Sequence, residues 1–438
     1  MKKRNFLAVL ASCAVVAGMM PMTVSAAKYA PVAGDSEKAN FDKYLVIDEQ
    51  ANVPNVSFEY TVAAGTAQAF NADKKTIEIY AGPTPENILF TGDVVADTNT
   101  TDKKFEIAFE QDDTDDAVLF ADKAATDYVK NLDAGEKYAK KTATLDFSNV
   151  KFDEPGIYRY IITETQGTEQ GITYDADSTR VLDVYVEDKD GTLEVSSYVL
   201  HANDETITID GTTYGSDGNI ISGATDKDDL GAVGSDYKSQ GFTNEYTSHD
   251  ITLSKTVTGN QGSKDKYFKF VVKISGAVKG TVYTVDLSSA DTTVASNSAT
   301  KAEYIGKTNP KSVTVGDDGT AEATFYLQNG QSIKILGLAD GTAYEIEETP
   351  EDYVASAEVT GDTTRTSDSS DVAFENNKVY DTEIKADTTV AYTNNRQGTI
   401  PTGIILSVAA PVAIGVAVLG GIVFLVIKNK KRDAEEEE

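Results

Sequence analysis

The chain has 438 residues, of which 70 are acidic and 39 basic, so its formal net charge is −31. A charge this negative argues against a protein that binds nucleic acid or an anionic membrane surface, because both partners require a basic patch. It is otherwise typical of a protein that must stay soluble at high local density. The length and the apolar content of 40% allow two or three domains with cores of their own.

Residues 1–26 have the pattern of a secretory signal peptide. Three basic residues at positions 2–4 precede an apolar run, and Val24-Ser25-Ala26 forms a small-x-small cleavage site. The single cysteine, Cys13, lies inside this segment. It could belong to a lipid-attachment box, although the apolar run before it is short. We therefore expect an exported protein whose mature chain contains no disulfide bond.

The region after the signal peptide is expected to be all-β. Apolar and polar residues alternate over 182–187 and again over 332–335, where the preceding Asn329-Gly330 predicts a hairpin. Residues 188–191 and 317–319 are typical of tight turns. A calcium loop is the alternative for both, but the ligand spacing is incomplete. Residues 113–131 are the one segment in which we expect a helix.

A membrane-spanning segment is predicted near the end of the sequence. Residues 404–427 carry no charge, and a helix over them would be about 36 Å long, enough to cross a hydrocarbon core of roughly 30 Å. The basic residues at the start of 428–438 predict that this charged tail stays in the cytoplasm. An ordinary membrane anchor is the plain interpretation of this segment.

The residues just before this span change that interpretation. Ile400, Pro401, Thr402 and Gly403, followed by the apolar span and the basic residues, resemble the cell-wall sorting signal of Gram-positive surface proteins in a shortened form. The resemblance implies that a sortase recognises residues 398–403, attacks the Thr402 carbonyl and releases Gly403 and everything after it. Proline suits such a motif because it fixes an extended backbone that a groove can bind.

Two segments of the mature chain share landmarks in the same order, with a boundary near residues 247–250. Each has a lysine near its first strand, a phenylalanine at a fixed spacing after that lysine, a glutamate four positions after a tyrosine, and an asparagine on its last strand. The landmarks are Lys43, Phe58, Glu164 and Asn244 in the first segment and Lys255, Phe270, Glu348 and Asn394 in the second.

These landmarks resemble the Ig-like, CnaB-type domains of sortase-assembled backbone pilins. In those domains a lysine and an asparagine join through a side-chain isopeptide bond beside a glutamate. The chain departs from the family by lacking a Tyr-Pro-Lys motif and by having a longer first segment. The resemblance implies tandem Ig-like β-sandwiches over 27–246, which includes an insert, and 247–397.

The resemblance also implies two crosslinking sites. Their lysine, glutamate and asparagine residues would be Lys43, Glu164 and Asn244 in one site and Lys255, Glu348 and Asn394 in the other. Taken singly, a surface lysine, an edge glutamate and a turn asparagine are the plain interpretations, but two ordered triplets favour the crosslink. Burial lowers the pKa of a lysine and raises that of a glutamate, so a neutral amine and a neutral acid can coexist. The acid could then polarise the asparagine carbonyl and pass a proton to the departing ammonia.

A pilin also needs an acceptor amine, for which Lys238 is the first candidate and Lys227 the second. Bonds from Thr402 to such a lysine would make a head-to-tail polymer of identical subunits. The function expected is that of the structural shaft of a surface pilus, with sortases, minor pilins or a tip adhesin, and peptidoglycan as partners. A wall-anchored adhesin or minor pilin built from the same modules is the alternative.

A secreted enzyme is the third interpretation, and the sequence gives it little support. The chain has two histidines and neither a Gly-x-Ser-x-Gly elbow nor a plausible zinc set. We therefore expect no cofactor, no metal and no turnover of an external substrate. Isopeptide formation would be a self-catalysed, single-turnover reaction.

Overall fold

The computed structural model describes residues 37–72, 75–98, 103–124, 127, 129–202, 206–209, 212–215, 239–361 and 373–398. The expected signal peptide, both acceptor lysines, the Ile400–Gly403 motif and the apolar span 404–427 lie outside these residues. Within the described ranges, no helix is long and apolar enough to cross a membrane.

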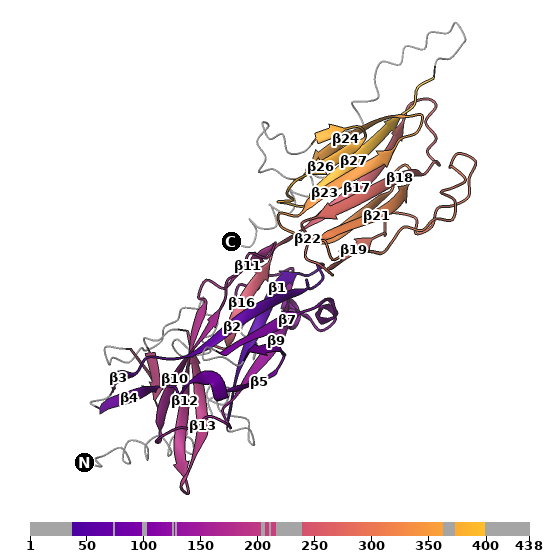
Figure 1. Ribbon diagram of the computed structural model, residues 1–438. Coiled ribbons are helices and arrows are strands. Elements are labelled where there is room, and N and C mark those ends of the chain that lie inside the picture. The colour runs from indigo at the N-terminus through magenta and orange to yellow at the C-terminus, as the bar shows by residue number, and fades with distance from the viewer. Residues whose placement is uncertain are drawn as a thin grey trace. The chain divides into compact units, whose positions relative to one another are not determined.

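The described residues form β-strands joined by turns and short 3-10 helices, so the all-β prediction is confirmed (Figure 1). The first half of the chain holds β1 (Lys38–Asp48), β2 (Val56–Ala64), β3 (Gln68–Ala72), β4 (Lys75–Ala81), β5 (Leu89–Gly92), β6 (Val94–Thr98), β7 (Lys103–Phe109), β8 (Val118–Leu119), β9 (Glu136–Asp146), β10 (Gly156–Glu164), β11 (Ile172–Thr173), β12 (Thr179–Lys189), β13 (Thr192–His201), β14 (Thr206–Ile209), β15 (Thr212–Gly215) and β16 (Gly241–Tyr246).

The second half repeats the pattern with fewer strands. It holds β17 (Ser248–Thr258), β18 (Phe268–Ser275), β19 (Val282–Asp286), β20 (Ser312–Thr314), β21 (Thr320–Leu327), β22 (Ser332–Ala339), β23 (Ala343–Thr349), β24 (Val354–Thr360), β25 (Ala373–Glu375), β26 (Lys378–Asp381) and β27 (Thr388–Asn395).

Each half contains two main sheets. In the first half their orders are β11-β16-β1-β9-β5 and β13-β12-β10-β2-β7-β6, with β8 beside β9 and β4 beside β10. In the second half they are β20-β19-β22-β17-β27-β24 and β21-β18-β23-β26-β25. Alternate residues of the facing strands fill one apolar core in each half. Two sheets that share a core in this way form a β-sandwich.

The first and last long strands of each half are neighbours. β1 pairs with β16 in parallel, and β17 pairs with β27 in parallel. In both halves the intervening chain crosses to the opposite sheet and returns before this pair closes. Residues near the start and near the end of each half therefore lie on two adjacent strands.

The helix expected over 113–131 is wrong for the part of that segment that the structure describes. The chain forms two short 3-10 helices there, η3 (Gln111–Thr114) and η4 (Phe120–Asp122), with β8 between them. Val118 pairs with Tyr138 of β9, so a tertiary strand contact replaces the local helical preference. A third 3-10 helix, η2 (Pro85–Asn87), precedes β5.

The three turn predictions had different outcomes. Residues 317–319 form a tight turn between β20 and β21, in which Gly319 has a positive φ angle of 73°. Residues 188–191 do form a tight hairpin turn, because β12 and β13 pair directly and both Asp190 and Gly191 have positive φ angles of 56° and 88°. The hairpin at Asn329-Gly330 is wrong. The turn joins β21 and β22, which belong to different sheets, and the Asn329 side chain accepts a hydrogen bond from the Val257 N–H group.

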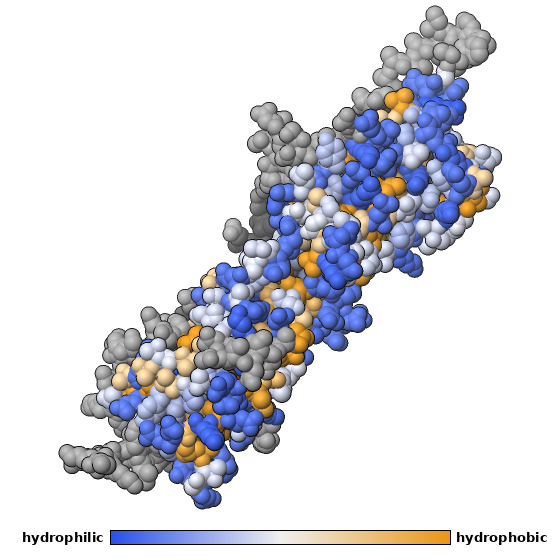
Figure 2. All heavy atoms as spheres, viewed as in Figure 1, coloured by the Kyte–Doolittle hydropathy of each residue, from blue (hydrophilic) through white to orange (hydrophobic). Residues whose placement is uncertain are grey.

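The surface is predominantly hydrophilic on the face drawn in Figure 2, with apolar residues scattered between polar ones. This pattern agrees with the strongly acidic composition. Single exposed apolar residues are ordinary on soluble surfaces.

Candidate functional site

Lys43 lies between the two sheets of the first sandwich. It projects from β1, its exposed fraction is 0%, and its Nζ atom lies 4.3 Å from the centre of the Phe58 ring. The Nζ atom also lies 2.5 Å from Oε1 of Glu164 on the opposite sheet. Burial lowers the pKa of Lys43 to about 8, although the charge of Glu164 opposes this shift. At pH 7 a meaningful fraction of this amine is neutral and able to attack a carbonyl.

Glu164 is the meeting point of the first site. Its Oε1 atom accepts hydrogen bonds from the Lys43 amine, from the Tyr60 hydroxyl at 2.8 Å and from Nδ2 of Asn244 at 3.2 Å. Glu164 and Asn244 are each 1% exposed. The amine and the amide nitrogen therefore contact the same carboxyl oxygen in a site closed to water.

The carbonyl of Asn244 has a different partner. Its Oδ1 atom accepts a hydrogen bond of 2.8 Å from the backbone N–H group of Asp175. The Asp175 carboxylate in turn accepts bonds from the N–H group of Thr243 and from the Arg180 guanidinium. Both hydrogen-bonding groups of the Asn244 amide are thus held.

The second sandwich contains the same core arrangement. Nζ of Lys255 lies 2.6 Å from Oε1 of Glu348, and Nδ2 of Asn394 donates a 2.8 Å hydrogen bond to that oxygen. The three residues are at most 2% exposed, and the ring centre of Phe268 lies 4.6 Å from Nζ. Burial lowers the pKa of Lys255 to about 8 and raises that of Glu348, in each case against the attraction between the two groups.

Strand register shows that the two sites are equivalent. Lys43 lies opposite Phe242 and Lys255 opposite Tyr392, and in each sandwich the asparagine lies two residues further along the partner strand. A shift of two residues keeps the asparagine on the same face as the lysine. The structure therefore brings together both triplets named from the sequence.

One landmark of the sequence repeat is wrong. Equal spacing from the lysine matched Phe58 with Phe270, but the ring beside the amine is Phe58 in the first site and Phe268 in the second. The residue opposite the glutamate is Tyr60 in the first site and Phe270 in the second. The path from the lysine to the next strand is two residues longer in the first sandwich, so equal sequence spacing does not give equal positions.

Three residues of the first site escaped sequence reasoning: Tyr60, Asp175 and Arg180. Tyr60 lies two positions after Phe58, on the same face of β2, and that spacing was the one available signal. Asp175 lies in an irregular segment between β11 and β12, where no periodicity indicates a role.

The two sites also differ in their remaining polar atoms. Among the described residues, Oδ1 of Asn394 has no hydrogen-bond partner, whereas Oδ1 of Asn244 has one. The Oε2 atoms of Glu164 and Glu348 are alike in having none. Phe270, which replaces Tyr60, has no hydroxyl. The second site therefore has fewer hydrogen bonds to its reacting groups than the first.

The arrangement can join an amine to a carboxamide. In each site one carboxyl oxygen contacts both the lysine amine, whose pKa burial lowers, and the asparagine amide nitrogen, so it can move a proton from the attacking nitrogen to the departing one. Fixed contact in a buried site also supplies a high effective concentration. Within the described ranges, no group of three or more His, Cys, Asp or Glu side chains could hold a metal ion.

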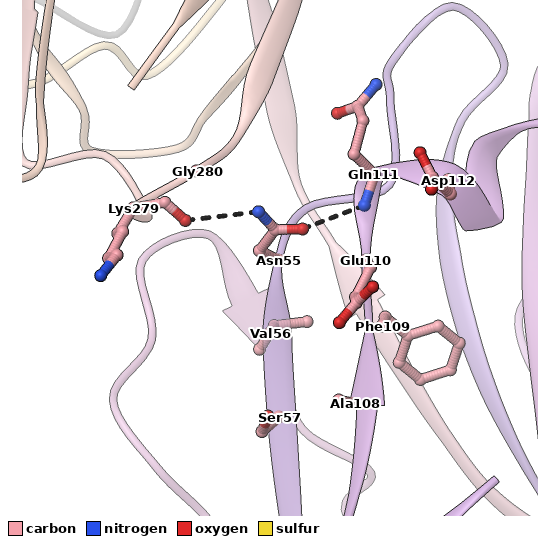
Figure 3. Close-up of a pocket in the computed structure, with 10 residues that line it drawn as sticks. All are labelled: Asn55, Val56, Ser57, Ala108, Phe109, Glu110, Gln111, Asp112, Lys279 and Gly280. Carbon is pink, nitrogen blue, oxygen red and sulfur yellow. Dashed lines mark hydrogen bonds between the residues drawn. The ribbon is translucent and has the colours of Figure 1, made fainter. Parts of the chain in front are cut away.

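The first half of the chain also contributes to a surface pocket, whose lining residues are drawn in Figure 3. Asn55 lies in its wall, where its side chain accepts a 2.9 Å bond from the Gln111 N–H group and makes a long 3.5 Å contact with the Lys279 carbonyl. The pocket shares no residue with either triplet. Its lining residues are Asn55, Val56, Ser57, Ala108, Phe109, Glu110, Gln111, Asp112, Lys279 and Gly280.

Two domain families match the chain. Residues 75–247 match the Spy0128-like isopeptide containing domain, and residues 249–378 match a domain of unknown function (DUF7601). A solved structure of the major pilin protein T3.2 from Streptococcus pyogenes aligns with 83% of this chain and 99% of its own, at 20% identity and a TM-score of 0.48.

Two curated proteins of Streptococcus pyogenes are also similar. The pilus tip adhesin Cpa is 32% identical over 157 residues, which are 36% of this chain and 18% of the adhesin. A pilin of serotype M1 is 26% identical over 291 residues, which are 66% of this chain and 72% of that pilin. The similarity is to structural pilus proteins, not to enzymes. The chain is a homologue of a streptococcal pilin and carries a Spy0128-like isopeptide domain.

Proposed function

We propose that this chain is the structural shaft subunit of a covalent surface pilus, stiffened by two intramolecular Lys–Asn isopeptide bonds. The observation that carries the proposal is the pair of buried Lys–Glu–Asn triplets. In each one the lysine and the asparagine lie at matching register on the first and last long strands, and the glutamate contacts them from the opposite sheet. One bond would join Lys43 to Asn244 and the other Lys255 to Asn394. Glu164 and Glu348 would relay the proton in each.

The domain division belongs to the proposal as well. We assign residues 27–246 to an N-terminal isopeptide domain with an insert and 247–397 to a C-terminal one. Two separate apolar cores and two closing strand pairs support this division. Each domain then has one crosslink between its own first and last strands.

Assembly would proceed through the sorting motif. A sortase would form an acyl-enzyme at Thr402, and a lysine of the next subunit would resolve it, so that identical subunits join head to tail. The support is the sequence Ile400–Gly403 and the similarity to pilins. Minor pilins or a tip adhesin and the peptidoglycan would complete the fibre at the cell surface.

Polymerisation makes a testable prediction for Lys238. Boiled cell-wall extracts should show a high-molecular-weight ladder, and Lys238→Ala should abolish it because the acceptor amine is gone. The ladder is read on an immunoblot, and Lys227→Ala is the matched control, which should polymerise normally. A ladder that survives Lys238→Ala would show that another lysine is the acceptor. A single monomer-sized band from the wild type would contradict the shaft assignment.

The alternative is an adhesin or minor pilin built on the same modules. It has one observation in its favour, the 157-residue similarity to a tip adhesin. That similarity covers 18% of the adhesin, which is consistent with a shared module. The same immunoblot separates the two functions. A shaft subunit is present in every band of the ladder, whereas the ladder forms without a tip protein.

The crosslinks should raise thermal stability. They close stretches of about 200 and about 140 residues, and by analogy with disulfides each would stabilise its domain by up to about 5 kcal/mol. Asn394→Ala keeps the Lys255–Glu348 ion pair but removes the electrophile, so the C-terminal domain should melt about 10–20 °C lower. Calorimetry measures this, with the neighbouring Asn395→Ala as control. Equal melting temperatures for Asn394→Ala and wild type would contradict the bond.

A further inference from the structure

The two sites hold the same three reacting residues but differ around the asparagine carbonyl. In the first site the backbone N–H group of Asp175 donates to Oδ1 of Asn244 at 2.8 Å. In the second site Oδ1 of Asn394 has no partner among the described residues. This oxygen gains negative charge when an amine attacks, so a donor aimed at it lowers the barrier.

We propose that the Asp175 N–H group is an oxyanion donor for the first crosslink, so that Glu164 relays the proton while the backbone activates the carbonyl. This inference rests on the proposed crosslinking reaction and assigns a new catalytic group to it. The glutamates support the division of roles, because in both sites the carboxyl oxygen contacts the amide nitrogen. The carboxyl polarisation of the carbonyl that we expected from the sequence is replaced here by a backbone donor.

The donor is fixed to the strand that carries the asparagine. Asp175 Oδ2 accepts a 3.0 Å hydrogen bond from the N–H group of Thr243, the residue before Asn244 on β16. The same oxygen accepts a 2.8 Å charge-assisted bond from Arg180, which is 5% exposed. Asp175 and residues 243–244 thus bond each other reciprocally, so the N–H group cannot move away from the carbonyl without breaking several contacts.

Arg180 positions this assembly. Its guanidinium also donates to Oγ of Ser239 at 2.8 Å and to the Gly241 carbonyl at 2.9 Å, and it lies 4.6 Å from the centre of the Phe242 ring. It therefore ties the start of β12 to the strand that carries Asn244. The positive charge of Arg180 also lowers the pKa of Lys43, against the opposite effects of Glu164 and Asp175.

The step balances without an outside reagent. The neutral Lys43 amine attacks Cγ of Asn244, and the carbonyl electrons move to Oδ1, where the Asp175 N–H group stabilises them. Glu164 takes a proton from the attacking nitrogen and delivers it to Nδ2. The C–N bond to Nδ2 then breaks, ammonia leaves, and an amide joins the two side chains.

The test separates folding from chemistry. The full chain, isolated unfolded, is refolded in detergent at pH 5.5, where an amine with a pKa of about 8 is almost entirely charged. It is then brought to pH 8 and quenched at intervals. After digestion, mass spectrometry quantifies the branched peptide that joins Lys43 to Asn244 and, in the same sample, the one that joins Lys255 to Asn394.

Two variants isolate the donor. Asp175→Ala keeps the backbone N–H group but loses the carboxylate, whereas Asp175→Pro removes the N–H group as well. We expect the first bond to form on the order of 100-fold more slowly in the proline variant than in the alanine variant, with the second bond unchanged in both. Equal rates for the first bond in the two variants would overturn the assignment.

The wild type gives a second test that needs no substitution. The first bond should form at least about tenfold faster than the second after the pH jump, and its rate should rise through pH 8 and then level off. A first bond slower than the second, or a rate that falls above pH 8, would overturn the assignment, because the fall would mean that a protonated carboxyl activates the carbonyl. If neither branched peptide forms, the crosslinking proposal itself fails. If both bonds form and the rate of the first bond is the same in the two Asp175 variants, only this inference fails.

Discussion

When the wild-type chain is pulled from its two ends in a force spectrometer, neither sandwich should unfold. The force enters the first domain through β1 and leaves it through β16, and the proposed bond joins these adjacent parallel strands. It then passes directly into β17 and leaves through β27, which the second bond joins. The residues between each pair of crosslinked positions carry no load, because a covalent path bypasses them.

In Asn394→Ala, the pulling force should extend the residues that the second bond otherwise bypasses. Without the second bond, about 140 residues can extend, which corresponds to an unfolding step of about 50 nm. Asn395→Ala changes the next residue on β27, which is not part of the triplet, and this control should show no step. An unfolding step in the wild type would contradict the mechanical role of the crosslinks.

The second large effect is expected at Glu348. Its Oε1 atom contacts both the Lys255 amine and the Asn394 amide nitrogen, so Glu348→Gln removes the proton relay from a site closed to water. General acid–base groups of this kind contribute roughly 100- to 10,000-fold, and the second bond should slow by that factor. The variant also leaves a buried lysine without a counter-charge, which favours its neutral form.

Glu347→Gln is the matched control for this variant. Glu347 is the preceding residue on β23, but its side chain is 43% exposed and pairs with Lys378 at 3.2 Å. This control should form both bonds at the wild-type rate. The first bond should form normally in Glu348→Gln, and site-resolved peptide mass spectrometry would show it. If the second bond formed at the wild-type rate in Glu348→Gln, Glu348 would not be the proton relay.

The strand content could be predicted because it depends on local patterns, and the two triplets were named from an ordered repeat together with the resemblance to isopeptide domains. Alternation marks strands such as β12, and two ordered copies of the same residue types mark a repeated site. The six triplet residues could be named without knowing the sheet order. Their register could not, since equal spacing matched Phe58 with Phe270 whereas the sheets match it with Phe268.

Features that depend on tertiary contact escaped the sequence. A helix was expected where Val118 pairs with Tyr138, and a hairpin was expected where the chain crosses between sheets after Asn329. The role of the Asp175 N–H group could not be predicted, because every residue except proline has a backbone N–H group. Only the folded chain shows that this one points at the Asn244 carbonyl. The asymmetry between the two sites could therefore be found only in three dimensions.

The intact mass of the fragment 27–398 tests the central claim most directly. Each bond releases one ammonia, about 17 Da, so the folded fragment should weigh about 34 Da less than its sequence mass. A mass deficit of one ammonia would mean that only one of the two bonds forms. A fragment that folds, stays soluble and retains its full sequence mass would contradict both crosslinks, and with them the assignment of this chain as a covalently stiffened pilus shaft.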